Sequence, residues 1–489
     1  MIQINNVTFN YAGGDESARL MRDGLHDVSL HIRRGELVLL CGESGCGKTT
    51  LTRLINGLIP HYYEGNLAGE VLVNGSDVTK TELYELSKTV GSVFQNPRSQ
   101  FFNVETDSEL AFACENQGLP FDEIEARLDD TIAHLKIESL MGRNIFKLSG
   151  GEKQKIACGC VHTAVPEIIV LDEPSSNLDA RATADLAKII EHWRSEGRTI
   201  VIAEHRLHYL RAFADRIIFM KNGAIEREFT IAEAQAQTPA LWAELGLRPL
   251  LFDDLESSVN STAAVEKIKL CDFDFAYKDG CDALRAGSFE IPRGGIIAMI
   301  GHNGAGKSTL ARCLCGLNKR FRGTVRIGER TLTRRTLLRS AYMVMQDVNH
   351  QLFCENVRAE VLLSSPTEDE VRVDELLASL NLSELAELHP MSLSGGQKQR
   401  VAVAGALAAE RELIIFDEPT SGLDLRHMQQ VSALIRDLRD GGKTVFVISH
   451  DLELILQACD HVIQLKDGKI RANYPLAGNA EQLIAAFTQ

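Results

Sequence analysis

The sequence has little of what would mark a nucleic-acid-binding, secreted or membrane-spanning protein. Its 52 Lys and Arg face 67 Asp and Glu, a formal net charge of −15, so the basic excess of a general nucleic-acid binder is missing. No apolar run approaches the roughly 18–20 residues that span a bilayer. The first residues, MIQINNVTFNY, alternate like a strand and lack the regions of a signal peptide. We therefore expect a soluble, cytosolic chain that does not bind nucleic acid.

The 11 cysteines also lack a pattern, because they are scattered and form no CxxC pair. Cys158 and Cys160 are two positions apart, as are Cys313 and Cys315, and on a helix such neighbours point to different sides. Reduced core thiols are the expected state, rather than disulfides or a metal site.

The sequence does contain a long internal repeat, which covers most of the chain. LLCGESGCGKTTLTRLINGL at 39–58 returns as MIGHNGAGKSTLARCLCGL at 299–317. Ser149 and Asp172 are 23 residues apart, as are Ser394 and Asp417. This long period predicts a duplicated domain. We expect a first domain at 1–245, a polar linker at 246–266 and a second domain at 267–489.

Each copy has the pattern of an α/β fold. Short apolar runs such as 37–40 and 168–171 alternate with helical patterns, and Phe121–Met141 is typical of a helix. The alternation predicts a parallel sheet with helices on both faces. The distance from Lys48 to Ser149 is 101 residues, whereas Lys307 to Ser394 is 87, so the stretch between them is a variable subdomain.

Each copy carries a GxxxxGK[ST] loop between a predicted strand and a predicted helix, at 42–49 and 301–308. Backbone N–H groups of such a loop converge on phosphate oxygens, and the helix N-terminus adds positive charge. Lysine pairs with the β- and γ-phosphates and the Thr or Ser ligates Mg²⁺. The predicted ATP-binding residues here are Gly42, Ser44, Gly45, Gly47, Lys48, Thr49, Thr50, Gly301, Asn303, Gly304, Gly306, Lys307, Ser308 and Thr309.

A cysteine lies inside the first of these loops. The positive end of the following helix lowers the pKa of a nearby thiol. The sequence therefore predicts a lowered pKa for Cys46, and inhibition of the first site when this thiol is alkylated.

Two acidic pairs follow apolar runs, where a carboxylate is costly unless it has a role. Asp172 and Asp417 are expected to hold Mg²⁺. Glu173 and Glu418 come next and are placed to polarise the attacking water as general bases.

These loops and acids occur in many NTPases. The motif LSGG followed by EKQK or QKQR, here called the signature, occurs in far fewer protein families. With these motifs the chain resembles the ATP-binding cassette (ABC) family in both halves. The resemblance implies an ATPase with ATP and Mg²⁺ and two tandem ABC nucleotide-binding domains. Each is a P-loop parallel-sheet core with a helical signature subdomain.

The resemblance also implies an intramolecular head-to-tail pairing, in which the signature of one half completes the ATP site of the other. Ser394, Gly395 and Gly396 would then complete the site of Lys48. Ser149, Gly150 and Gly151 would complete the site of Lys307.

Further residues match family positions. His205 and His450 correspond to the switch histidine, and Gln95 and Gln346 to the Q-loop glutamine that contacts Mg²⁺ or the water. With the acids they give the catalytic set Glu173, Glu418, His205, His450, Gln95 and Gln346, and the metal set Thr49, Gln95, Asp172, Ser308, Gln346 and Asp417. Tyr11 and Tyr277 resemble the adenine-stacking aromatic, although both end strand-like stretches and a core role stays open.

The first half departs from the family pattern at two places. Its signature ends in Lys155 rather than Arg, and Glu204-His205-Arg206 stands where the second half keeps Ser449-His450-Asp451. Neither change removes a catalytic group, so both sites are expected to be competent.

The Q-loop segments share a second pattern. QNPRSQFFNVETDSEL at 95–110 and QDVNHQLFCENVRAEV at 346–361 both place Gln, Phe and Glu at the same three offsets. Phe101 and Phe102 are expected to form a docking surface for a helix, or to be buried in the variable subdomain. The pattern resembles the ATPases of energy-coupling factor (ECF) importers. It implies a peripheral protein at the cytoplasmic face of the cell membrane, with a transmembrane T component and a small S component that binds a vitamin or metal ion.

Three other functions compete with this one. A fused ATPase of a sugar or nucleoside ABC importer would have similar length. A soluble ABC ATPase that acts on ribosomes would have a long basic linker, whereas Asp253, Asp254 and Glu256 make this one acidic. A role without turnover is disfavoured because Glu173 and Glu418 are both present.

Overall fold

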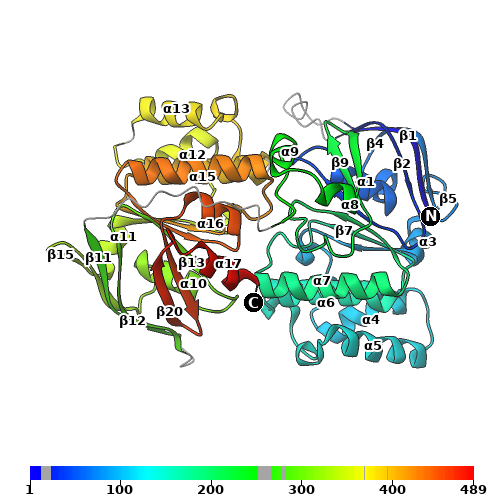
Figure 1. Ribbon diagram of the computed structural model, residues 1–489, viewed down its shortest axis with the longest axis horizontal. Coiled ribbons are helices and arrows are strands. Elements are labelled where there is room, and N and C mark those ends of the chain that lie inside the picture. The colour runs from blue at the N-terminus through cyan, green and yellow to red at the C-terminus, as the bar shows by residue number, and fades with distance from the viewer. Residues whose placement is uncertain (13–23, 252–265, 278–281, 368, 394, 489) are drawn as a thin grey trace. The chain divides into compact units, whose positions relative to one another are not determined.

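The computed structural model describes residues 1–12, 24–251, 266–277, 282–367, 369–393 and 395–488 (Figure 1). It contains two compact units, one made mainly of residues 1–254 and the other mainly of 255–489. Each unit has a six-stranded sheet and a four-stranded antiparallel sheet.

The six-stranded sheet of the first unit positions its candidate site. Its strand order is β10-β9-β3-β8-β7-β6, and all neighbours are parallel except β9 and β10. The strands are β3 (Leu37–Cys41), β6 (Val90–Val93), β7 (Ile168–Asp172), β8 (Thr199–Ala203), β9 (Arg216–Lys221) and β10 (Ala224–Thr230). Strands β3 and β8 are buried along their whole length and apolar except for Thr199, as expected for a parallel sheet covered on both faces.

The antiparallel sheet of the first unit has the order β2-β1-β4-β5. Its strands are β1 (Ile2–Tyr11), β2 (Leu25–Ile32), β4 (Gly65–Val73) and β5 (Ser76–Asp77). The helices of the unit are α1 (Lys48–Ile55), α2 (Leu58–His61), α3 (Leu83–Thr89), α4 (Thr106–Asn116), α5 (Phe121–Leu135), α6 (Gly150–Ala164), α7 (Ala180–Ser195), α8 (Ile231–Gln235) and α9 (Pro239–Glu244).

The variable subdomain of the first unit is helical, because α4 and α5 pack against α6. The helix predicted at Phe121–Met141 is shorter than expected. Helix α5 ends at Leu135, where Lys136 adopts a left-handed φ of 54°, and a 3₁₀ turn (Glu138–Leu140) follows. Two more 3₁₀ turns lie at Pro97–Ser99 and Ile145–Lys147.

The second unit repeats this architecture. Its sheets have the orders β16-β17-β18-β13-β19-β20 and β12-β11-β14-β15. The strands are β11 (Lys267–Ala276), β12 (Asp282–Pro292), β13 (Ile296–Ile300), β14 (Arg322–Ile327), β15 (Arg330–Leu332), β16 (Ala341–Val344), β17 (Leu413–Asp417), β18 (Thr444–Ile448), β19 (His461–Lys466) and β20 (Lys469–Pro475).

Its helices are α10 (Lys307–Leu314), α11 (Arg334–Ser340), α12 (Val357–Ser364), α13 (Glu370–Ser379), α14 (Gly395–Ala408), α15 (Leu425–Asp440), α16 (Leu452–Ala458) and α17 (Ala480–Thr488). Short 3₁₀ turns lie at Val348–His350, Ser383–Leu385 and Pro390–Ser392. The α/β class predicted from the sequence is thus confirmed in both halves.

The start of the predicted linker packs with the first unit. Leu247 and Leu250 are buried in the same apolar cluster as Trp242 of α9. The rest of the 246–266 stretch falls mostly on residues 252–265, outside the described part. The domain boundaries 1–245 and 267–489 remain a proposal.

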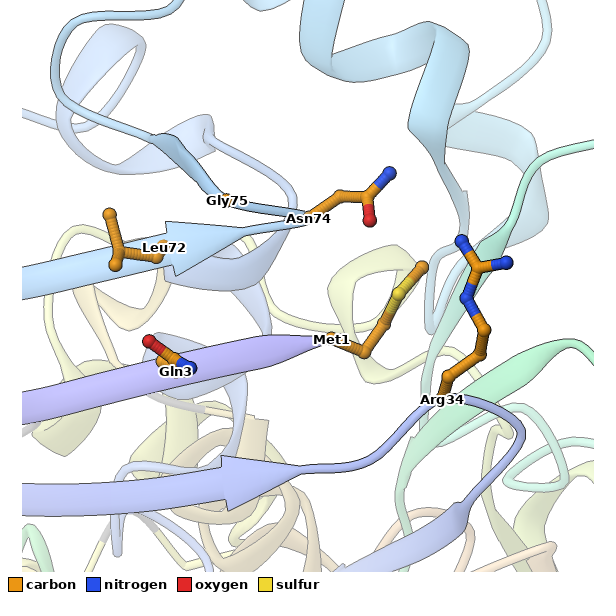
Figure 2. Close-up of a pocket in the computed structure, with 6 residues that line it drawn as sticks. All are labelled: Met1, Gln3, Arg34, Leu72, Asn74 and Gly75. Carbon is orange, nitrogen blue, oxygen red and sulfur yellow. The ribbon is translucent and has the colours of Figure 1, made fainter.

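None of the helices in the described part of the chain is long and apolar enough to span a bilayer. Figure 2 shows a pocket at the ends of β1 and β4. Its lining residues are Met1, Gln3, Arg34, Leu72, Asn74 and Gly75. None of them belongs to the motifs of the sequence analysis, so this pocket is not the candidate site.

Candidate functional sites

The glycine-rich loop of the first unit connects β3 to α1, as the sequence predicted. Gly42 and Gly47 have φ of 148° and 102°. A Cβ on Gly42 would overlap the carbonyl oxygen of Met220, so only glycine fits there. In the second unit Gly301 has φ 144° and would meet the Leu465 carbonyl in the same way. Both loops therefore need glycine at these positions, because the backbone has a positive φ and a Cβ would clash with a neighbouring carbonyl.

The loop lysines are buried and lie across their own loops. Lys48 Nζ donates to the carbonyls of Gly42 at 2.9 Å and Glu43 at 3.0 Å. Lys307 Nζ donates to the Gly301 carbonyl at 2.6 Å and lies 3.1 Å from His450 Nε2. Each ammonium is thus held beside a helix N-terminus, where a phosphate binds favourably.

A hydroxyl and a carboxylate meet at each predicted metal position. Thr49 Oγ1 donates to Asp172 Oδ1 at 3.1 Å, and Ser308 Oγ donates to Asp417 Oδ1 at 3.4 Å. Burial, with help from Glu173, raises the pKa of Asp172 to about 6, and burial also raises the pKa of Asp417. Hard oxygen donors whose charge is disfavoured by burial fit Mg²⁺, which would supply the missing counter-charge.

The predicted general base of the first unit is held at both oxygens. Gln95 Nε2 donates to Glu173 Oε2 at 2.6 Å, and His205 Nε2 lies 3.2 Å from Oε1. Burial works against the charged carboxylate, but His205, Lys48 and Gln95 outweigh it and lower the pKa of Glu173. The carboxylate is therefore ionised at neutral pH, as a base must be.

The second unit supports its base differently. His450 Nε2 lies 3.3 Å from Glu418 Oε1, and the His450 backbone N–H donates to Oε2 at 3.2 Å. Gln346 is exposed, and no hydrogen bond joins it to Glu418, although both residues are described. The structure thus brings the predicted glutamine to the base in the first unit and not in the second.

The unusual Glu204 has a structural role that sequence reasoning missed. Its side chain is buried and accepts the backbone N–H of His205 at 2.9 Å and of Arg206 at 3.3 Å. In the second unit Ser449 Oγ accepts the equivalent N–H, that of Asp451, at 3.0 Å. The second oxygen of Glu204 accepts the hydroxyl of Tyr209 at 3.0 Å. The sequence signal for this role was Tyr209, which lies five residues after Glu204 and can bond to its carboxylate.

The two candidate adenine-stacking tyrosines are not equally free. Tyr11 packs on the core with its edge against Phe9, and Arg53 donates to its hydroxyl at 3.0 Å. Tyr277 is 46% exposed. The open ring of Tyr277 suits stacking, whereas Tyr11 has at least part of the core role that the sequence left open.

The signature residues begin long helices in both units. Ser149 forms a capping box with Glu152 at the start of α6, and Gly150 and Gly151 form its first turn. Gly395 and Gly396 begin α14, while Ser394 lies outside the described residues. A Cβ on Gly395 or Gly396 would meet no described atom within 4 Å. Packing within the described structure does not require glycine there.

The predicted lowering of the Cys46 pKa is wrong, which removes the basis for selective alkylation of this thiol. The thiol is only 5% exposed, and burial raises its pKa although Lys48 Nζ lies 3.8 Å from the sulfur. Loss of hydration outweighs the lysine and the helix N-terminus, so the thiol stays protonated.

The shared pattern of the Q-loop segments is explained by two clamps. Gln100 accepts the Phe94 N–H at 3.2 Å and donates to the Ser92 carbonyl at 3.1 Å. Glu109 accepts the N–H groups of Phe102 at 3.0 Å and of Asn103 at 2.6 Å. In the second unit Gln351 and Glu360 make the equivalent bonds to Met345, Met343, Phe353 and Cys354.

The clamps display one phenylalanine in each unit. Phe102 is 77% exposed and stacks on Phe112 with ring centroids 5.1 Å apart, and Phe353 is 73% exposed. Phe101 instead packs against the core of the first unit. The two phenylalanines expected to act together therefore differ, since Phe101 is partly buried and only Phe102 is exposed to solvent.

Comparisons with known proteins show which family both halves are similar to. A family model described as ABC transporter matches residues 25–176 and 284–421. Two proteins of Treponema denticola, both named as proposed ABC transporter ATP-binding proteins, are 46% and 40% identical to this chain. The alignments cover 96% of both chains in the first case and 98% of both in the second. A solved structure titled RNase-L Inhibitor has a TM-score of 0.66 at 19% identity, covering 98% of this chain and 92% of that one, which shows a shared fold alone.

Proposed function

Because the chain belongs to the ABC transporter family and hydrolyses ATP, we propose that it is the energy-coupling ATPase of an ECF-type membrane importer for a vitamin-like compound or a metal ion. The observation that carries this proposal is the pair of exposed rings, Phe102 and Phe353, each held out by the same Gln and Glu clamp. A clamp repeated in both halves supports a shared docking role, since an exposed aromatic ring adds little to folding.

The chemistry follows from the residues around each loop. Lys48 and Lys307 would hold the β- and γ-phosphates, and Glu173 and Glu418 would take the proton of the attacking water. Thr49 with Asp172, and Ser308 with Asp417, would hold Mg²⁺, which when bound neutralises phosphate charge. Gln95, bonded to Glu173, would orient the water in the first site.

Each ATP site would be completed by the signature of the other half, as the family resemblance implies. The open space around Gly395 and Gly396 supports this part of the proposal, because their lack of side chains would admit a phosphate. ATP would then hold the halves together, and hydrolysis would release them.

The docked partner would be a helix of a transmembrane T component, with a small S component that binds the cargo. Phe102 follows Gln95, which bonds to Glu173, within one short segment, and this segment would couple movement of that helix to the base. This arrangement would place the chain at the cytoplasmic face of the membrane.

The test is to extract the chain from its native membrane in mild detergent and identify its partners by mass. A large T-type protein together with a small, very apolar subunit is the expected result. Two six-helix permease domains with a binding protein would favour a sugar or nucleoside importer instead. Ribosomes, or the absence of any membrane protein, would overturn the transport proposal.

A further inference from the structure

Three histidines from separate helices converge in the first unit, and none of them is a predicted ATP-site residue. His134, His162 and His192 each offer a ligand nitrogen, and these three atoms lie within 4.8 Å of one another. His134 is exposed, His162 is buried and His192 is intermediate. The group is therefore buried on one side and accessible to solvent on the other. The centroids of the His134 and His192 rings are 4.6 Å apart, and those of His162 and His192 are 5.6 Å apart.

All three histidines occupy the last turn of their helix. His134 is in the last turn of α5, His162 in that of α6 and His192 in that of α7. The C-terminus of a helix carries partial negative charge and favours a cation. Three such ends with three imidazoles therefore suit a bound cation better than any single one.

Carboxylates lie beside all three imidazoles. Asp130 Oδ1 lies 3.1 Å from His134 Nδ1, and Asp130 Oδ2 lies 3.3 Å from His162 Nε2. Glu196 Oε1 lies 3.7 Å from His192 Nε2. His134 Nδ1 also donates to the Asp130 carbonyl at 2.9 Å, which leaves its Nε2 as the free lone pair. For His134 this is the way in which partners orient metal-binding histidines. For His162 the contact is on Nε2 itself, so Asp130 would have to give way to the metal there.

The second unit is an internal control, because it has the same fold without this cluster. Counted from the signature motif, the equivalent positions are Ser379 in α13, Leu407 in α14 and Asp437 in α15. Folding of an ABC domain therefore does not need histidine at any of the three positions.

We propose that His134, His162 and His192 form a Zn²⁺ site that ties helices α5 and α6 to α7. Imidazole is a preferred ligand of this metal, and three histidines leave a fourth position for water or for a carboxylate of Asp130 or Glu196. With Zn–N bonds of about 2.0–2.1 Å, tetrahedral ligand atoms lie about 3.4 Å apart, so side-chain rotations would close the present spacing. Helix α6 packs against both α5 and α7, and all three lie in the same part of the first unit in Figure 1.

The buried Trp193 provides a reporter for this site. Its Nε1–H donates to His162 Nδ1 at 2.9 Å, so Nε2 is the ring nitrogen left for a metal. A neutral ring bound through Nε2 carries its proton on Nδ1, facing the indole N–H. Zn²⁺ binding therefore has to open the Trp193 hydrogen bond, which changes the surroundings of the indole.

The experiment uses the full chain with Trp242→Phe, which leaves Trp193 as the only one of the 2 tryptophans. After removal of metals with a chelator, ZnCl₂ is titrated without nucleotide while Trp193 emission and bound zinc are measured. We expect one Zn²⁺ per chain, a saturable change in emission and a rise in the melting temperature. Co²⁺ in place of Zn²⁺ should give a tetrahedral visible spectrum without a thiolate charge-transfer band.

Two variants decide the assignment. His134→Gln with His192→Gln changes only accessible ligands and keeps every cysteine, and should weaken Zn²⁺ binding by at least about tenfold. His31→Gln, an exposed histidine on β2, is the matched control and should bind like the parent. Unchanged zinc affinity in the double variant, or no emission change in the parent, would overturn the proposal.

Discussion

At the scale of single residues, the first ATP site combines two neighbouring carboxylates whose pKa values shift in opposite directions. Interactions with His205, Lys48 and Gln95 keep Glu173 ionised, whereas burial favours the protonated form of Asp172. Two adjacent acids with separated pKa values have separate tasks, one as base and the other as a ligand awaiting a cation. The environment of each oxygen, rather than residue type, assigns these roles.

Asp172 should make the stability of the first unit depend on pH. Its pKa rises from 3.8 to about 6 on folding, so the folded state binds the proton more tightly and stability falls as pH rises from about 4 to about 6. The full penalty above that range is at most about 3 kcal/mol. Asp172→Asn should therefore raise the melting temperature by a few degrees at pH 7.5.

Differential scanning fluorimetry without nucleotide and with a chelator measures this effect. The gain should shrink as pH falls toward 4.5, where Asp172 becomes protonated in the wild type, and Asp129→Asn on α5 is the exposed-acid control. An equal gain at both pH values would mean that the amide stabilises by some other means.

At the scale of elements, the Q-loop segment shows how a loop is made rigid without regular structure. Gln100 donates a hydrogen bond to the end of β6. Glu109 of α4 accepts the N–H groups of Phe102 and Asn103, which would otherwise bond to solvent. The backbone is fixed from both sides, and the ring of Phe102 is left outside. The repeated Gln and Glu thus hold the backbone in place, and the phenylalanine side chain is left exposed to solvent.

The two neighbouring phenylalanines should respond differently to truncation. Phe101→Ala should destabilise the first unit by about 1–3 kcal/mol, because this ring packs on the core. Phe102→Ala with Phe353→Ala should leave stability within about 0.5 kcal/mol, because both rings are exposed. The double variant should nevertheless lose most of its membrane partner.

Denaturant unfolding and detergent pull-down, measured on the same preparations, separate the two effects. Tyr84→Ala, an exposed ring at 64%, serves as the control for general surface change. Full retention of the partner by the Phe102 and Phe353 double variant would contradict the docking role.

At the scale of the whole chain, the sequence predicted what is local and repeated, and missed what depends on distant contacts. The loop lysines, Thr49 with Asp172, and Glu173 with His205 were predicted because their motifs lie at the ends of adjacent parallel strands. Burial of the Cys46 thiol and the partial burial of Phe101 depend on neighbours that no local pattern contains. The same is true of the three histidines, which come from three helices.

Pairing between the halves predicts a specific pattern of coupling between variants. Gly395→Asp and Gly150→Asp place an anion at a signature helix N-terminus, and neither Cβ would clash within its own unit. An aspartate there suits the helix but repels a phosphate. If each signature completes the opposite site, Gly395→Asp should add nothing further to the loss of ATP binding caused by Lys48→Ala. Gly150→Asp should likewise add nothing to Lys307→Ala.

The crossed combinations supply the control. Gly395→Asp with Lys307→Ala, and Gly150→Asp with Lys48→Ala, disable both sites and should abolish ATP binding, whereas the first pairs keep one site intact. Equilibrium binding of a fluorescent ATP analogue to all four double variants measures the stoichiometry, expected to be one for the first pairs and zero for the crossed pairs. The reverse result would mean that each signature serves the loop of its own half, and the head-to-tail arrangement would have to be abandoned. Because the readout is nucleotide binding rather than hydrolysis, the loss of Lys48, which helps to keep Glu173 ionised, does not affect this test of how the halves are arranged.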